Sequence, residues 1–143
     1  MNTQMKGSFS RWSSRSAQWY EEASQYTNYH NELTKHIAPY LSSRERCCEL
    51  ACGTGTLARH LAPLTAHYTA NDIDPESIDF CKKVQEQNPV RNLEFAEGDW
   101  HTVLKGQTFE MCIRDRDVFP VSASFVQPNS RMPRGIQEAS ADR

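Results

Sequence analysis

The sequence has no long hydrophobic run and no pair of cysteines at metal-binding spacing. No stretch approaches the roughly 20 apolar residues of a membrane-spanning helix, and the polar residues 1–10 lack the apolar core of a signal peptide. An odd number of cysteines without a C-x-x-C pair predicts neither a disulfide framework nor a zinc site; they are Cys47, Cys48, Cys52, Cys81 and Cys112. We therefore expect a reduced, cytoplasmic protein that holds no metal and does not enter a membrane.

An excess of basic charge is also missing. The 16 Lys and Arg residues are balanced by 18 Asp and Glu, which gives a formal net charge of -2 at pH 7. Nucleic-acid-binding proteins usually display a clustered basic excess, so the composition does not indicate nucleic acid as a partner. A small-molecule substrate is favoured, and the composition does not indicate an oligomeric state.

The 143 residues form one domain of ordinary size, which is small for a complete α/β enzyme. Residues 1–16 are polar and rich in Ser and Arg, which predicts a flexible leader, and residues 17–110 carry the patterned domain. From residue 117 onward, prolines recur among Ser, Arg and Gln without a helical or strand period. No element is predicted there, and residues 111–143 are treated as a separate tail.

The patterned domain alternates strands with helices. Its first helix is predicted from Tyr26 to Ile37, where apolar residues recur at three- and four-residue steps. Buried strands are predicted at 47–51, 68–73 and 93–96, with helices following the first two. Repeated βα units imply an α/β fold with a Rossmann-like, doubly wound parallel sheet. The sheet is expected to be truncated after the third or fourth strand.

The first strand leads into a glycine turn, Gly53-Thr54-Gly55-Thr56-Leu57-Ala58, which fits the pattern G-x-G-x-x-G/A. Glycines allow a tight turn and close approach of a ligand to the backbone. The same turn also occurs without a ligand, or with a nicotinamide dinucleotide. Glu49 favours another ligand, because a carboxylate inside an apolar strand needs a partner such as an ammonium group or backbone amides.

Two further acidic residues follow later strands. Asp72 ends the second strand, where a carboxylate can accept the hydroxyls of a ribose. It could instead cap the next helix, but Asp74, directly before Pro75, suits that role better. Gly98-Asp99-Trp100 follows the third strand, so Asp99 could accept from an adenine amine, while Trp100 is either adjacent to the ligand or part of the core.

Together these segments resemble class I S-adenosyl-L-methionine-dependent methyltransferases. Glu49 to Gly55 resembles the family motif E/D-x-G-x-G-x-G with Ala51 at the first glycine, residues 70–75 resemble the second motif, and Gly98-Asp99 resembles the third. The resemblance implies that the glycine loop contacts the methionine moiety, with Glu49 orienting its amino group. Asp72 would hold the ribose, Ile73 would pack on the adenine and Asp99 would contact its amine. The implied cofactor-binding residues are Glu49, Ala51, Cys52, Gly53, Thr54, Gly55, Asp72, Ile73, Gly98, Asp99 and Trp100.

The implied reaction is an in-line methyl transfer, which mainly requires alignment of donor and acceptor and exclusion of water. No catalytic side chain is assigned. By analogy with the family, Tyr20 and Trp19 belong to a lid over the methyl group; the alternative is that they only pack a helix rich in aromatic residues against the domain. An NAD(P)-dependent oxidoreductase is an alternative that Glu49 and Gly98-Asp99 disfavour. A non-catalytic module that binds a nucleotide cofactor is another.

The tail raises a separate expectation. Met111-Cys112-Ile113-Arg114-Asp115-Arg116 resembles the translated end of a transposon used to prepare sequencing libraries, so residues 111–143 are expected to be non-native. The alternative is a genuine fourth strand at 110–113. A sheet without its later strands would leave the edge next to the first strand uncovered. We therefore expect an incomplete fragment that is poorly folded and inactive alone.

Overall fold

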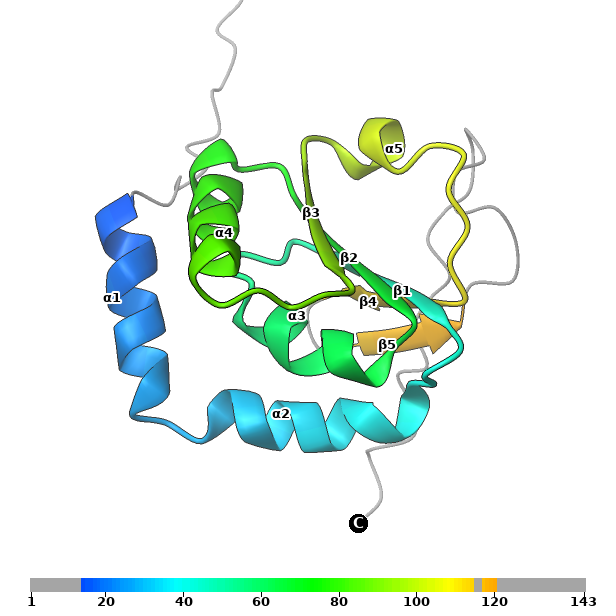
Figure 1. Ribbon diagram of the computed structural model, residues 1–143, viewed down its shortest axis with the longest axis horizontal. Coiled ribbons are helices and arrows are strands. Elements are labelled where there is room, and N and C mark those ends of the chain that lie inside the picture. The colour runs from blue at the N-terminus through cyan, green and yellow to red at the C-terminus, as the bar shows by residue number, and fades with distance from the viewer. Residues whose placement is uncertain (1–13, 115–116, 121–143) are drawn as a thin grey trace, which may run out of the picture.

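The computed structural model describes residues 14–114 and 117–120 (Figure 1). The elements are α1 (Ser14–Gln25), α2 (Tyr29–Ile37), η1 (Ala38–Tyr40), β1 (Arg46–Leu50), α3 (Thr56–Leu61), η2 (Ala62–Leu64), β2 (His67–Asp72), α4 (Pro75–Gln87), β3 (Leu93–Glu97), α5 (Trp100–Val103), β4 (Met111–Arg114) and β5 (Asp117–Pro120). The strands form one sheet in the order β3-β2-β1-β4-β5. All neighbours are parallel except β4 and β5, which are antiparallel. The predicted Rossmann-like α/β fold is confirmed.

The sheet separates two hydrophobic clusters, because successive residues of β1 face opposite sides. Cys47 belongs to the larger cluster, which α2, α3 and α4 cover, whereas Cys48 belongs to the smaller one beside α5. In Figure 1, α1 lies beside α4 and α2 lies beside α3, so both N-terminal helices wrap around the same helical layer. The larger cluster therefore lies beneath the N-terminal helices, and its strand face carries Glu49.

The N-terminal helical region differs from the expected single helix over 26–37. Two helices form instead, separated by a turn in which the amide of Tyr26 donates to the carbonyl of Ala23. Tyr26 is 92% exposed, while Ile37 at the other end is fully buried. The apolar period therefore belongs only to α2. Helix α1 begins within the expected leader, and residues 1–13 lie outside the described part of the chain.

Strand β4 changes the expected edge of the sheet. It pairs with β1 along its length, with Cys112 opposite Cys48 and Ile113 opposite Glu49. The prediction of an uncovered edge beside the first strand is therefore wrong. Residues 111–114 form a fourth strand, which was the alternative. The non-native origin of residues 111–143 stays a prediction, and residues 121–143 lie outside the described part. Among the helices described, none has the length and apolar character to cross a membrane.

Candidate functional site

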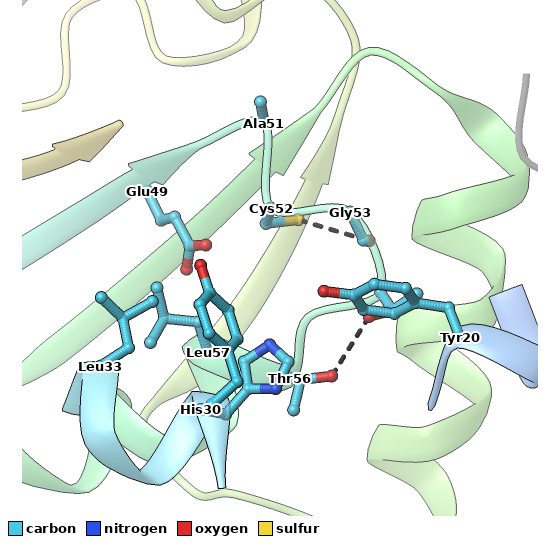
Figure 2. Close-up of a pocket in the computed structure, with 11 residues that line it drawn as sticks. Tyr20, His30, Leu33, Glu49, Ala51, Cys52, Gly53, Thr56 and Leu57 are labelled. Atoms are coloured by element: carbon cyan, nitrogen blue, oxygen red, sulfur yellow. Dashed lines mark hydrogen bonds between the residues drawn. The ribbon is translucent and has the colours of Figure 1, made fainter. Parts of the chain in front are cut away.

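A cavity of about 210 Å³ lies where the carboxyl end of β1 meets the two N-terminal helices (Figure 2). Its walls come from α1, α2, the last part of β1, the glycine loop and the start of α3. The lining residues are Tyr20, Tyr29, His30, Leu33, Glu49, Ala51, Cys52, Gly53, Thr54, Thr56 and Leu57. The structure thus brings together the first predicted motif, apart from Leu50 and Gly55, with residues of both N-terminal helices.

The glycine loop owes its path to three residues with positive φ: Ala51 at 58°, Gly53 at 55° and Gly55 at 76°. This left-handed backbone costs an alanine about 1–2 kcal/mol, which explains why glycine suits the position of Ala51. A Cβ atom on Gly55 would lie 2.9 Å from Cys81 Sγ and 2.9 Å from Phe95 Cε1, whereas one on Gly53 would meet no atom within 4 Å. Gly55 is therefore required for packing, and Gly53 leaves its backbone open to a ligand.

Glu49 is the buried charged residue of β1, and its side chain lines the cavity. It is only 5% exposed, and Oε2 accepts a hydrogen bond of 2.7 Å from the hydroxyl of Tyr68. Burial raises the pKa of Glu49 to about 7; the hydrogen bond from Tyr68 opposes the shift, and the charge of Asp72 adds to it. A positively charged ligand group in the cavity would therefore stabilise the ionised form of Glu49.

Asp72 joins the end of β2 to the glycine loop. Its Oδ2 accepts from the backbone N–H of Gly53 at 2.8 Å, and its Oδ1 accepts from the N–H of Asp74 at 2.9 Å. Asp74 caps α4 as predicted, accepting from the backbone N–H of Ser77 at 3.1 Å. Although Asp74 caps the helix, Asp72 also has partners, because its carboxylate accepts hydrogen bonds from two backbone N–H groups. A carboxylate offers about four lone-pair sites, so two remain for a ligand.

The other predicted residues follow β2 and β3 and do not line the cavity. Ile73 is 65% exposed directly after β2. Gly98 has a φ of 123°, and Asp99 caps α5 by accepting from the N–H of His101 at 2.8 Å. Trp100 stacks on His101 and packs against the smaller core cluster. Because parallel strands end at one edge, these residues lie along the same edge of the sheet as the glycine loop.

Sequence reasoning missed the contribution of α2, which brings Tyr29, His30 and Leu33 to the cavity. The His30 ring makes edge contacts with Tyr29 and Tyr20, at centroid distances of 5.1 Å and 6.3 Å, and stacks 6.3 Å from His60. The helical spacing of Tyr29 and Leu33 was the available signal, since it marks one face of α2. Of the two suggested lid aromatics, Tyr20 lines the cavity and Trp19 does not.

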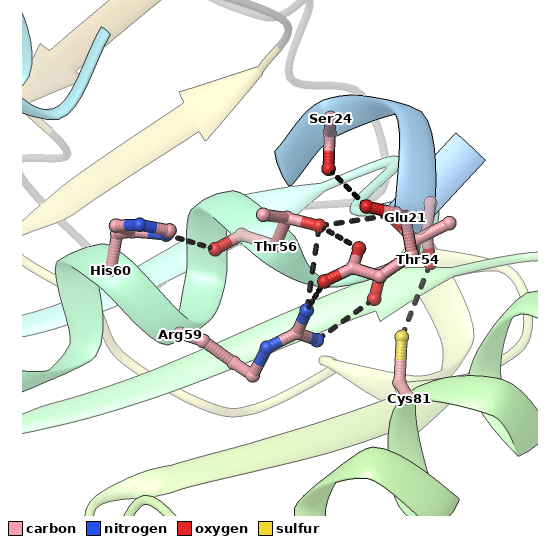
Figure 3. A network of polar contacts seen from close by, with 8 residues as sticks. Glu21, Ser24, Thr54, Thr56, Arg59, His60 and Cys81 are labelled. Carbon is pink, nitrogen blue, oxygen red and sulfur yellow. Dashed lines mark hydrogen bonds and ion pairs between the residues drawn. The ribbon is translucent and has the colours of Figure 1, made fainter. Parts of the chain in front are cut away.

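Helix α1 is held against the glycine loop by a largely buried polar network (Figure 3). Glu21 pairs with Arg59, and the two side chains are 19% and 14% exposed. The other carboxylate oxygen of Glu21 accepts from the hydroxyl of Thr56, and Arg59 Nη1 donates to the carbonyl of Thr54 at 3.1 Å. The network therefore ties α1, which carries Tyr20, to the loop and to α3.

Comparison with known proteins identifies a family and several structural relatives. A family described as a methyltransferase domain matches residues 41–134. A dimethyladenosine transferase from Plasmodium falciparum is 32% identical with a TM-score of 0.52, and the match covers 59% of this chain and 31% of that one. The YcgJ protein from Bacillus subtilis is 15% identical with a TM-score of 0.53, covering 59% and 38%.

A coclaurine N-methyltransferase bound to N-methylheliamine and SAH is 16% identical with a TM-score of 0.53, and the match covers 59% of this chain and 26% of that one. The matched region therefore spans well under half the length of these solved relatives. No curated protein shows significant similarity to the chain.

Proposed function

Because the chain belongs to the methyltransferase domain family of class I S-adenosyl-L-methionine-dependent enzymes, we propose that it serves methyl transfer from this cofactor to a small-molecule acceptor. The observation that carries the proposal is the buried Glu49 carboxylate, which shares a cavity with the open backbone of the glycine loop. A ligand that fits there presents a positive group to Glu49 and lies close to Gly53.

The chain's residues fit the amino-acid, ribose and adenine parts of this cofactor. Glu49 offers a carboxylate to an amino group, and Gly53 offers a backbone that no Cβ atom obstructs. Asp72 retains lone pairs for the ribose hydroxyls. Ile73 exposes an apolar side chain on which a base could pack, with Asp99 near its amine and with Gly98 and Trp100 shaping the same edge.

The cavity alone is smaller than the roughly 300–1,000 Å³ of typical ligand sites. We therefore propose that the cavity holds the amino-acid end of the cofactor and that the nucleoside lies along the carboxyl ends of the strands. S-Adenosyl-L-methionine supplies a methyl group on a good, neutral leaving group. The chain's own residues need only fix that group in line with an acceptor and exclude water from it.

The acceptor is proposed to be a small molecule because the net charge of -2 gives no basic excess for a polyanion. The solved relatives include enzymes named for dimethyladenosine and for coclaurine, and similarity at 16% identity supports the fold alone.

Isothermal titration calorimetry with S-adenosylhomocysteine and NADH tests the proposal on the 143-residue chain. We expect S-adenosylhomocysteine to bind and NADH not to bind. Glu49→Gln should weaken binding by about 10-fold or more, because a hydrogen bond to a charged group is worth about 1.5–3 kcal/mol. Glu86→Gln, at an exposed position on α4, is the matched control.

Binding of NADH alone would favour the oxidoreductase alternative. Binding of S-adenosylhomocysteine without transfer of a labelled methyl group to any pooled metabolite extract would favour a non-catalytic module.

A further inference from the structure

Glu21 reaches from α1 to the start of α3, directly beside the glycine turn (Figure 3). One oxygen of its carboxylate accepts a hydrogen bond from the hydroxyl of Thr56, and the other pairs with Nη2 of Arg59. Both charged side chains are largely buried, with Glu21 19% exposed and Arg59 14% exposed. A carboxylate of the protein therefore already occupies the position between Thr56 and Arg59.

The guanidinium group of Arg59 has protein partners on both of its terminal nitrogens. Besides the pair with Glu21, Nη1 donates to the carbonyl of Thr54 at 3.1 Å, and Nη2 donates to the hydroxyl of Thr56 at 3.4 Å. A ligand anion would have to displace Glu21 to pair with this cation, and removing one partner of a buried ion pair is strongly destabilising. Arg59 is therefore committed to the carboxylate of the chain itself.

This position adjoins the cavity, because Thr54 and Thr56 belong to the cavity lining. The charge of Glu21 also acts on the cavity. Burial raises the pKa of Tyr20, another lining residue, and the nearby Tyr29 and Glu21 add to the shift. A ligand group that lies near Thr56 would therefore be exposed to the negative charge of Glu21.

The pattern of the glycine turn, residues 53–58, is shared with dinucleotide-binding proteins, in which the pyrophosphate lies where the following helix begins. In this chain Glu21 lies at that place, so a pyrophosphate would meet a carboxylate and would find Arg59 already paired. Placing like charges side by side disfavours binding. S-Adenosyl-L-methionine carries no phosphate and does not meet this repulsion.

We infer that Glu21 occupies the phosphate position beside the glycine turn and thereby excludes nucleotides that carry a diphosphate from the cofactor site. The inference rests on the proposed function, since the cofactor proposed there carries an amino acid in place of a phosphate on its nucleoside. Glu21 is then a specificity residue, which distinguishes two classes of cofactor that fit the same glycine pattern.

ADP and adenosine test the inference, because they share a nucleoside and differ only in the diphosphate. Competition against radiolabelled S-adenosylhomocysteine on the 143-residue chain measures both affinities. In the wild type, we expect ADP to bind about 10-fold or more weakly than adenosine, because of the repulsion by Glu21. Glu21→Gln removes that charge and leaves Arg59 without its anion, so the ratio should shift toward ADP by about 10-fold or more.

Three comparisons separate the effect of charge from a structural effect. S-Adenosylhomocysteine should bind Glu21→Gln no more than about 2-fold more weakly than it binds the wild type, the scatter expected for a residue that does not contact it. Glu22→Gln removes the same charge at an exposed neighbouring position of α1 and should leave the ratio unchanged. A double variant with Glu21→Gln and Arg59→Gln also lacks the cation and should lose most of the gain for ADP.

An unchanged ratio in Glu21→Gln, or loss of S-adenosylhomocysteine binding in that variant, would show that Glu21 only holds α1 in place. An equal shift in Glu22→Gln would show a general effect of net charge. Each of these results overturns the inference and leaves the proposed function intact, because the wild type still binds S-adenosylhomocysteine. A wild-type chain that does not bind S-adenosylhomocysteine would instead refute the proposed function, and the inference with it.

Discussion

Glu49, which we propose binds the amino group of the cofactor, shows how a buried carboxyl group can reduce the stability of the protein that carries it. Its carboxyl group is buried and accepts a hydrogen bond from the Tyr68 hydroxyl, and its pKa is raised from 4.5 to about 7. The folded chain therefore holds a proton that the unfolded chain releases at a lower pH. A ligand ammonium would replace the missing solvation and reverse the shift, so the same group that weakens the free protein would strengthen the complex.

This leads to a prediction for stability against pH. Because the folded pKa is the higher one, the stability contributed by protonated Glu49 is fully present below pH 4.5 and is lost as pH rises through about 7. Above that pH the free energy of unfolding is lower by about 3 kcal/mol, because each unit of difference between the folded and unfolded pKa corresponds to about 1.36 kcal/mol. Glu49→Gln should remove most of this slope. Urea unfolding of both proteins at several pH values measures it, and equal slopes would contradict the assignment.

Gly55 gives a second prediction, because packing and backbone conformation both act at this position. In Gly55→Ala, the new Cβ atom would press on Cys81 and Phe95 while the backbone remains left-handed. We expect a loss of about 2–5 kcal/mol in the free energy of unfolding, from strain of about 1–2 and overpacking of about 1–3 kcal/mol. Gly106→Ala is the control, since φ there is 79° but no atom lies within 4 Å. Chemical denaturation should show only the smaller strain cost in the control, and equal losses would rule out the packing role.

At the scale of elements, the position of α1 depends on a contact that links two distant parts of the chain. Glu21 on α1 and Arg59 on α3 form a largely buried ion pair that is also bonded to the glycine loop. Helix α1 contributes few other buried side chains, with Ala17 as its buried apolar residue among those described. The ion pair therefore has a large share in placing Tyr20 at the cavity.

Removing one partner should release α1. Arg59→Met leaves the Glu21 carboxylate without its cation, and breaking a buried pair in this way typically costs about 3–5 kcal/mol. Because α1 packs mainly against α4 and not against the sheet, we expect hydrogen exchange to rise most in residues 14–25. Lys83→Met removes an exposed pair with Asp79 and should cost about 0–1 kcal/mol. Unchanged protection of α1 in Arg59→Met would show that the pair does not hold the helix.

The sequence predicted the elements whose signals are local. The strands around Glu49, Asp72 and Ala96 and the cap at Asp74 follow from apolar runs and from an acidic residue before proline, and the structure has them within one or two residues. The contacts of His30 with His60 and of Glu21 with Thr56 and Arg59 were not predictable in this way. They join residues dozens of positions apart, and no periodicity reveals which face of one helix meets a given loop.

At the scale of the whole molecule, the sheet is covered unequally. Helices α2, α3 and α4 cover the larger cluster, whereas the described part of the chain covers the smaller cluster only with α5 and its flanking residues, including Leu104 and Phe109. The site lies on the side with the more complete cover, together with α1 and the cavity. Folding of the cofactor site should therefore depend mainly on the larger cluster and on the pairing of β1 with both its neighbours.

Strand β4 decides whether β1 is a central strand or an edge. Cys112 and Ile113 are fully buried and belong to opposite clusters, so a chain ending at residue 110 would lose packing on both faces as well as the ladder to β1. Losing a single large buried side chain already costs about 2–5 kcal/mol, and a small domain has only about 5–15 kcal/mol of stability.

We predict that a chain ending at residue 110 does not unfold cooperatively, whereas a chain ending at residue 120 unfolds like the 143-residue chain. Circular dichroism during urea titration compares the three lengths, because the slope of the transition reports the surface that a folded core exposes. A cooperative transition in the shortest chain, with an unchanged midpoint, would show that residues 111–114 add nothing to the fold and would favour their non-native origin. Loss of the transition would instead show that the sheet requires this strand, whatever its source.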